Sequence, residues 1–241
     1  MRFAWLGLVV FACSPDIAKL PPLGGGGGGT GGTGSGSNPG STTDANSDEL
    51  QGFVCVLPDP RDFTACLAAG VGGISVALTG VGSAVTANDG TFTLPFPTGT
   101  NLTWTISGSN VVPSTMGFST TGVVFALTVE GFNDLLNENG AICGDPTVCG
   151  TVLGNVLHAG SALEFTIVGA APLGLYQTFY ATPDDQQDWL NGSATSTLGT
   201  FLIAGLGSNV ETLTMQPATG SAEIIATPIT LGGLTFISAQ L

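Results

Sequence analysis

Positive charge is scarce in this sequence, and so is charge of any kind. The 241 residues include three Lys and Arg together and one His, against 17 Asp and Glu, and charged residues make up only 8% of the chain. The formal net charge at pH 7 is -14. Such a chain repels nucleic-acid phosphates and anionic lipid surfaces, so we exclude both as binding partners.

Signatures of catalysis are also missing. The single histidine, His158, ends the string GTVLGNVLH and precedes a turn at Ala159-Gly160. One His without a recognisable nucleophile motif supports neither a catalytic triad nor a zinc site, and no G-x-S-x-G string occurs. We therefore expect His158 at the surface or at a strand end, in a protein that is not an enzyme and holds no cofactor.

Glycine and apolar residues are abundant instead. The chain has 38 Gly, and 43% of it is hydrophobic. Low charge with much Gly, Thr, Val and Ala favours an extracellular all-β protein over a cytosolic helical one.

Hydrophobic residues alternate in four short segments of the first half. The segments are GISVALTG (Ile74, Val76, Leu78), NDGTFTLPFP (Phe92, Leu94, Phe96), NLTWTISG (Leu102, Trp104, Ile106) and GVVFALTV (Val123, Phe125, Leu127, Val129). Short alternating strands between Gly and Pro turns predict an antiparallel β-sandwich. Trp104 is in phase with its apolar neighbours, so we assign it to the core.

One segment has a helical pattern. In EGFNDLLNENG, Phe132, Leu135 and Leu136 share a face, and Gly140 ends the segment. We expect a short helix there that joins two halves of the chain.

The second half resembles a copy of the first. TANDGTFTLPFPTGTNLTWTIS aligns with TSTLGTFLIAGLGSNVETLTMQ, so that Gly90-Thr91-Phe92 matches Gly199-Thr200-Phe201. A repeat of domain length predicts two tandem domains. We place a first β-sandwich at residues 51–128, a connector with the helix and a disulfide loop at 129–149, and a second β-sandwich at 150–241.

The order of these strands resembles the carboxypeptidase regulatory-like domain. GISVALTG followed by TANDGTFTLPFP carries the resemblance, which covers most of residues 51–128 and, less completely, 150–241, where Leu198 replaces the Asp of the turn. It implies seven-stranded, transthyretin-like sandwiches. Such domains serve as accessory, display or binding units and bring no catalytic residues.

The first residues have the pattern of an export signal. Met1-Arg2 precedes an apolar run from Phe3 to Phe11, which is too short to span a bilayer as a helix. The following string VFAC resembles the lipobox of bacterial lipoproteins, with Val in place of the usual Leu and Phe in place of a small residue. The resemblance implies a signal peptide at 1–12 and lipidation of Cys13. The alternative is a secretory signal cleaved elsewhere, with Cys13 incidental.

Ser14 is the residue type that permits outer-membrane sorting, so the resemblance also implies an exported, lipid-anchored protein of the bacterial outer membrane. Residues 13–50 contain a Gly-rich run with almost nothing apolar to bury. We expect them to form a disordered tether between the anchor and the folded part.

Four cysteines remain once Cys13 is assigned to the anchor. Cys55 and Cys66 bracket one Pro- and Asp-containing segment, and Cys143 and Cys149 bracket another. The spacings do not match a zinc knuckle and no second His is present, so a metal site is disfavoured. Because export favours oxidation, we predict the disulfides Cys55–Cys66 and Cys143–Cys149.

An acidic loop near a Trp is the other feature of interest. TPDDQQDWLNG contains Asp184, Asp185, Asp188 and Trp189. A solvated acidic loop is the simplest interpretation, and a Ca²⁺ site is an alternative because clustered carboxylates are hard oxygen ligands. Trp189 either caps the edge of the sandwich or is exposed as a contact surface for sugar or protein.

These features favour a non-catalytic cell-envelope lipoprotein. Its β-sandwich modules would serve protein–protein interaction with envelope or surface proteins, or structural spacing. The alternative is a surface lipoprotein that binds carbohydrate or another ligand through its second domain. In that case polysaccharide is the expected partner, and the site residues would be Tyr176, Tyr180, Asp184, Asp185, Asp188 and Trp189.

Overall fold

The protein has an all-β fold, as predicted. The structure, a computed structural model, describes residues 49–67, 70–141, 147–171, 176–183, 189–207 and 212–241. Its helix α1 (Val129–Glu138) lies between two groups of strands. The first group is β1 (Glu49–Val56), β2 (Ser75–Leu78), β3 (Gly82–Val85), β4 (Thr91–Pro95), β5 (Thr103–Gly108), β6 (Val111–Gly117) and β7 (Val123–Ala126).

The second group follows the helix and ends near the end of the sequence. It consists of β8 (Cys149–His158), β9 (Ser161–Ala162), β10 (Ile167–Ala171), β11 (Gln177–Ala181), β12 (Trp189–Leu190), β13 (Thr200–Gly207), β14 (Thr212–Gln216), β15 (Glu223–Ala226) and β16 (Leu234–Gln240).

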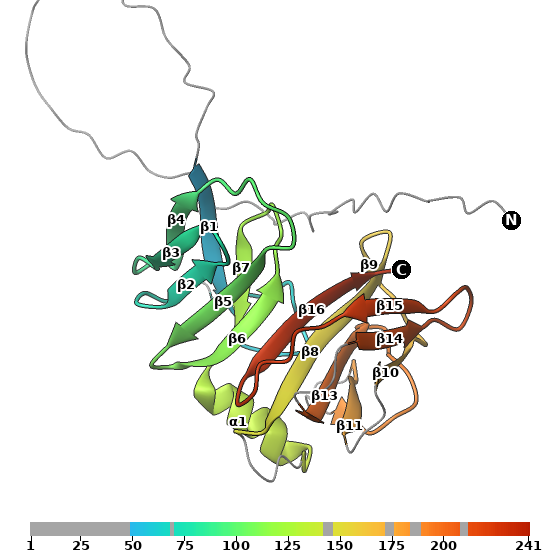
Figure 1. The fold of residues 1–241 in the computed structure, drawn as a ribbon. Helices are drawn as coiled ribbons and strands as arrows, with labels where there is room; N and C mark the ends of the chain where they lie inside the picture. The colour runs from blue at the N-terminus through green and yellow to red at the C-terminus, as the bar shows by residue number, and fades with distance from the viewer. Residues whose placement is uncertain (1–48, 68–69, 142–146, 172–175, 184–188, 208–211) are drawn as a thin grey trace, which may run out of the picture.

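The strands form one large sheet and two small ones (Figure 1). The large sheet has the order β12-β11-β13-β8-β16-β6-β5-β2-β3, and the small sheets are β4-β1-β7 and β10-β14-β15. On β8, Leu153 belongs to the core under the first small sheet, whereas Val152 and Val156 belong to the core under the second. Because alternate side chains of a strand point to opposite faces, the two small sheets cover opposite faces of the large one.

Strand β16 joins the two halves. It pairs in parallel with β8 of its own half and also with β6 of the first half, where Thr235 lies opposite Thr115. The hydroxyl of Thr115 lies 2.7 Å from the Thr230 hydroxyl and 3.3 Å from that of Thr235. The boundary between the halves is therefore closed by backbone and side-chain hydrogen bonds.

Pairing is mostly antiparallel, as predicted, but three pairs are parallel: β1 with β7, β16 with β8 and β16 with β6. In each half the chain returns through other strands before its last strand lies beside its first, so these two strands run in the same direction. The large sheet is continuous across the predicted domain boundaries at residues 128 and 150. The division into separate domains stays a prediction.

The two halves repeat one topology. The arrangement β4-β1-β7 with β2-β5-β6 recurs as β13-β8-β16 with β10-β14-β15. Strand β13 begins at Thr200, 109 residues after β4 begins at Thr91, and β14 begins at Thr212, 109 residues after β5 begins at Thr103. The offset found in the sequence alignment is thus the offset between equivalent strands.

A buried threonine has the same role in each half. The Thr86 hydroxyl accepts a hydrogen bond from the backbone N–H of Ile74 (3.0 Å) and donates to a loop carbonyl oxygen (2.8 Å). The Thr195 hydroxyl accepts from the backbone N–H of Thr166 (2.9 Å) and likewise donates to a loop carbonyl oxygen (2.7 Å). Both threonines thereby satisfy buried backbone groups just before equivalent strands, β2 and β10.

The Gly-Thr-Phe string also has a structural reason. Phe92 on β4 lies opposite Gly52 on β1, and Phe201 on β13 lies opposite Gly154 on β8. A Cβ atom at Gly52 would lie 2.2 Å from Cζ of Phe92, and one at Gly154 would lie 2.5 Å from Cζ of Phe201. In both halves the aromatic ring therefore packs over a glycine of the facing strand.

The predicted core positions are largely correct. Trp104 is fully buried, with Phe92 in an edge-to-face contact at 5.5 Å. Helix α1 begins after the N-cap Thr128, whose hydroxyl accepts from the Gly131 N–H, and its predicted apolar face packs on the core through buried Leu135.

Two predictions of facing direction were wrong. In β7, Val124 and Ala126 are fully buried, whereas Val123 and Phe125 lie on the other, partly covered face. Phe96 is 52% exposed because β4 ends at Pro95, one residue before it.

Candidate functional site

The segment between Cys55 and Cys66 forms a loop closed by a disulfide. The predicted bond is present, with the two Cα atoms 5.0 Å apart. We call residues 57–65 the disulfide loop. It leaves the end of β1 in the first half and reaches the second half of the protein.

Arg61 connects this loop to the second half. Its Nη2 atom lies 3.0 Å from Oδ2 of Asp59, and its Nη1 donates to the carbonyl oxygen of Thr182 at 2.9 Å. The Thr200 hydroxyl donates to the Arg61 carbonyl oxygen at 2.9 Å. Arg61 is only 9% exposed, so its charge is held among fixed partners away from bulk water.

Phe63 anchors the loop from the other side. Its ring makes edge-to-face contacts with Phe125 of β7 at 5.2 Å and with Phe236 of β16 at 6.2 Å between centroids. These contacts cover the face of β7 that the alternating pattern misassigned.

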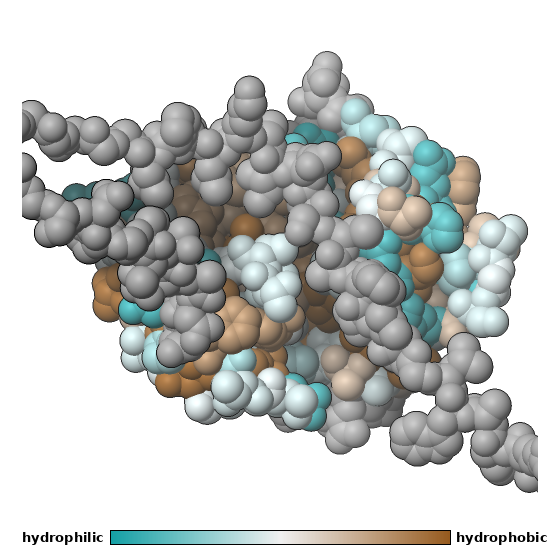
Figure 2. Space-filling view, turned by 90° about the horizontal axis from the view of Figure 1, so that it is seen from above, coloured by the Kyte–Doolittle hydropathy of each residue, from teal (hydrophilic) through white to brown (hydrophobic). Residues whose placement is uncertain are grey.

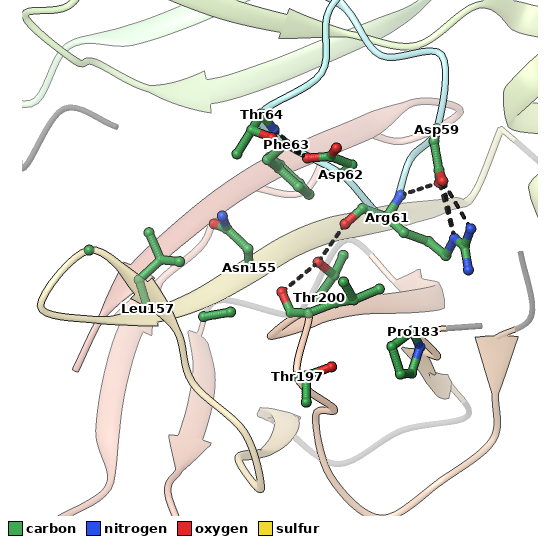
Figure 3. A pocket seen from close by; sticks show the side chains of 13 residues that line it. Asp59, Arg61, Asp62, Phe63, Thr64, Asn155, Leu157, Pro183, Thr197 and Thr200 are labelled. Atoms are coloured by element: carbon green, nitrogen blue, oxygen red, sulfur yellow. Dashed lines mark hydrogen bonds and ion pairs between the residues drawn. The ribbon is translucent and has the colours of Figure 1, made fainter. Parts of the chain in front are cut away.

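A cleft of about 520 Å³ lies between the disulfide loop and the second half (Figure 3). We call it the loop cleft. Its lining residues are Asp59, Arg61, Asp62, Phe63 and Thr64 from the loop, with Asn155, Leu157, Gly160, Ala162, Pro183, Thr197, Leu198 and Thr200 from the second half. The volume lies in the range of small-molecule binding sites.

The loop cleft has acceptors that the protein uses only in part. Asp62 Oδ1 accepts from the Thr64 N–H at 2.8 Å and from its hydroxyl at 2.6 Å. Asn155 Oδ1 is buried, and among the described residues no group donates a hydrogen bond to it. Figure 3 shows the Asn155 side chain extending from β8 toward the loop.

The lining of the loop cleft is mixed in character. Threonine hydroxyls, an amide and an Asp–Arg ion pair lie beside apolar side chains. Within the described residues, no group of three His, Cys, Asp or Glu side chains is placed to hold a metal ion. Two carboxylates against one guanidinium leave a net negative charge, which disfavours anions.

A smaller pocket of about 160 Å³ also borders the disulfide loop. It is lined by Pro58, Asp59, Pro60, Gly131, Asp134, Leu135, Glu138 and Trp189. It brings together the loop, α1 and β12.

The predicted aromatic contact surface requires a correction. Trp189 is 8% exposed and Tyr180 is 4% exposed, and each belongs to a hydrophobic core. The Tyr180 hydroxyl accepts from the Val168 N–H at 2.9 Å, and the Tyr176 hydroxyl accepts from the Ala170 N–H at 3.0 Å. The tyrosines therefore hold β10 in place, and Trp189 caps the sheet edge, the alternative stated above.

Burial also changes the titration of one of these groups. Loss of solvation raises the pKa of the Tyr180 phenol, and the hydrogen bond from Val168 opposes that rise.

Other predicted residues lie outside the described part of the chain. These are the lipidation residue Cys13, Cys143 of the second disulfide, and Asp184, Asp185 and Asp188 of the acidic loop. Cys149 begins β8, and its pairing with Cys143 stays a prediction, as does the Ca²⁺ alternative. His158 is at a strand end and exposed, as predicted, with Nδ1 2.7 Å from the backbone oxygen of Leu241.

Sequence reasoning missed the loop cleft, although two signals were present. Arg61 is the only Lys or Arg after residue 19. Leu198 is the position where the second repeat departs from the first, which has Asp89 there. Asp89 accepts hydrogen bonds from the Thr91 hydroxyl and N–H, which lower its pKa, whereas Leu198 lines the cleft.

No protein-family profile and no curated protein matches the chain. Among solved structures, it is similar to the streptococcal ancillary pilin (9% identity, TM-score 0.21, 81% of this chain) and spans 63% of that protein's length. It is also similar to the shaft pilin SpaA from Lactobacillus rhamnosus GG (6%, 0.23, 80% of this chain and 97% of that one). A third is the Bacillus anthracis TIE protein (14%, 0.22, 80% and 33%).

These similarities are too low to carry an argument about function. Within the described residues, α1 is the longest helical segment, and no helix there has the length and hydropathy needed to span a membrane.

Proposed function

We propose that this protein is a non-catalytic lipoprotein of the cell envelope that displays a two-lobed β-structure for protein–protein interaction or spacing. The observation that carries this proposal is the continuous sheet, in which β16 bonds to both halves. The disulfide loop adds a second connection through Arg61 and Phe63. A spacer or scaffold needs such a fixed relation between its parts.

The edges and surface of the sheets supply contact sites for another protein. Strand β3 ends the large sheet and β15 ends a small one, and exposed side chains lie on both: Val85 on β3 and Ile224 on β15. Edge strands with unpaired backbone groups can pair with a further chain. Hydrophobic and hydrophilic residues lie side by side on the face in Figure 2.

Attachment would follow from the first residues of the chain. The apolar run before Cys13 and the lipobox-like VFAC support export and lipidation, and Ser14 supports the outer membrane. We expect Cys13→Ala to move the protein from the membrane fraction to the soluble exported fraction and to abolish incorporation of labelled palmitate. A variant that stays in the membrane fraction without label would contradict the anchor.

Cross-linking on intact cells tests the interaction role. The tagged full chain is extracted gently in detergent, and both polypeptides and sugars that co-purify are identified. We expect one recurrent protein partner, and we expect the cross-link to be lost when edge residue Ile224 is replaced by Lys. Recovery of no partner protein would contradict the interaction role, and enzymatic turnover by the purified chain would contradict the proposed function as a whole.

A further inference from the structure

We propose that the loop cleft is a binding site for a neutral saccharide. This inference goes beyond the proposed function, because an interaction or spacer module needs no small-ligand site. It rests on the lining of the cleft, on its charge and on one amide whose oxygen the described residues leave unpaired.

Part of the lining of the loop cleft is apolar. Phe63 lies on the loop, and Leu157, Ala162, Pro183 and Leu198 lie on the second half. A sugar ring presents C–H groups on its faces, which pack on aromatic and aliphatic side chains of this kind. A strongly polar ligand with no apolar face would leave these apolar side chains unused.

The remaining lining residues offer polar groups of mixed kind. Asp62 uses Oδ1 for Thr64, and the hydroxyl of Thr197 and the amide of Asn155 add a donor and an acceptor each. Neighbouring hydroxyls of a saccharide both donate and accept, so they match such a set. The Asp59–Arg61 pair supplies a fixed, mutually neutralised boundary.

Asn155 is the strongest single indication. It lies on β8 between residues that are buried and apolar, and its Oδ1 is buried with no donor among the described residues. Among the described residues, Trp104 Nε1 and Thr166 Oγ1 are also buried without a partner, but only Asn155 lines the cleft, where a ligand could offset the cost of the unpaired atom. A ligand hydroxyl that reaches Asn155 Oδ1 would supply the missing hydrogen-bond donor.

Anions and peptide strands fit the loop cleft less well. The net negative lining repels phosphate, sulfate and carboxylate groups. The floor strands β8 and β13 are each paired on both sides, so they offer no free backbone edge to an extended peptide. A neutral polyhydroxylated ligand carries no negative charge to be repelled and needs no free backbone edge.

A microarray of neutral glycans built from hexoses and N-acetylhexosamines tests the proposal, with heparin as the anionic comparison. The purified full chain is applied, and the dissociation constant of the best glycan is then measured by calorimetry. We expect binding of neutral glycans and none of heparin. We expect Asp62→Asn and Asn155→Leu each to weaken the affinity by about tenfold, the effect of losing one well-placed hydrogen bond.

Asp134→Asn on α1 removes a carboxylate outside the cleft and is the matched control, expected to bind as the wild type does. Near-UV circular dichroism verifies that each variant is folded. Unchanged affinity in both cleft variants, or no neutral glycan bound on the array, would overturn the site. Recovery of the envelope partner by these same variants shows that the proposed function stands independently.

Discussion

At the scale of single residues, polar groups in the interior decide where stability is gained and lost. Tyr180, Thr86 and Thr195 place hydroxyls next to backbone groups that would otherwise be unpaired. Asn155 does the reverse, because it buries an acceptor for which the described chain has no donor. Removing the polar atom should therefore lower the free energy of unfolding at Tyr180, Thr86 and Thr195 and raise it at Asn155.

Removal of the Asn155 amide should stabilise the free protein. Asn155→Leu keeps the side-chain size and removes the unpaired acceptor, so we expect the free energy of unfolding to rise by about 1 kcal/mol. Urea denaturation without sugar measures it, with Asn155→Ala as the control for lost packing. A loss of stability in the Leu variant would mean that the oxygen has a partner.

Tyr180 should make stability fall at alkaline pH. Its folded-state pKa is raised, so the unfolded chain ionises first, at about pH 10, while the folded phenol stays neutral. Its contribution is therefore complete below that pH and is lost as the pH rises through the unfolded pKa toward the folded one.

Tyr180→Phe isolates this effect. The variant should lose about 1 kcal/mol at pH 8 with its hydrogen bonds to Val168, and should lose less than the wild type on going from about pH 9 to pH 11. The urea midpoints of the wild type and the variant, measured at each pH, test this prediction. Parallel pH curves for the two proteins would refute the assigned role.

At the scale of elements, the structure is built from one motif used twice. The buried Thr and the Phe packed over a Gly occupy equivalent positions in both halves. The sequence alignment at an offset of 109 residues therefore joined residues with the same structural role, which is why it predicted strands and turns well.

The equivalence can be tested by paired substitution. We expect Thr86→Val and Thr195→Val each to lower the free energy of unfolding by about 1–3 kcal/mol, because each leaves a buried N–H without its acceptor. Thr→Ser at either position keeps the hydroxyl and should recover most of the loss. If Thr→Val left the free energy of unfolding unchanged at only one of the two sites, the two threonines would not be equivalent.

What the sequence could not predict depends on distant contacts. The facing direction of β7 is inverted because Phe63 covers its second face, so apolar residues on both faces removed the alternation signal. The loop cleft joins Arg61 to Thr200, 139 residues apart, and no local pattern relates them. By contrast, the short helix with its apolar face, the Cys55–Cys66 bond and the burial of Trp104 follow from local spacing and were predicted.

At the scale of the whole molecule, the two repeated halves share a sheet. Strand β16 contributes to the cores on both of its faces, with Phe236 in the first and Ala239 in the second. Damage to one core should therefore spread to the other, and the halves should not unfold as independent domains.

The most direct test follows the first core while the second is weakened. Leu213 is fully buried in the second core, and Leu213→Ala should cost about 2–5 kcal/mol. In a background with Trp5→Phe and Trp189→Phe, the fluorescence of Trp104 reports the first core alone. We expect Leu213→Ala to shift the Trp104 unfolding midpoint in urea by as much as the midpoint from far-UV circular dichroism. An unchanged Trp104 midpoint would contradict the account of one body joined through β16.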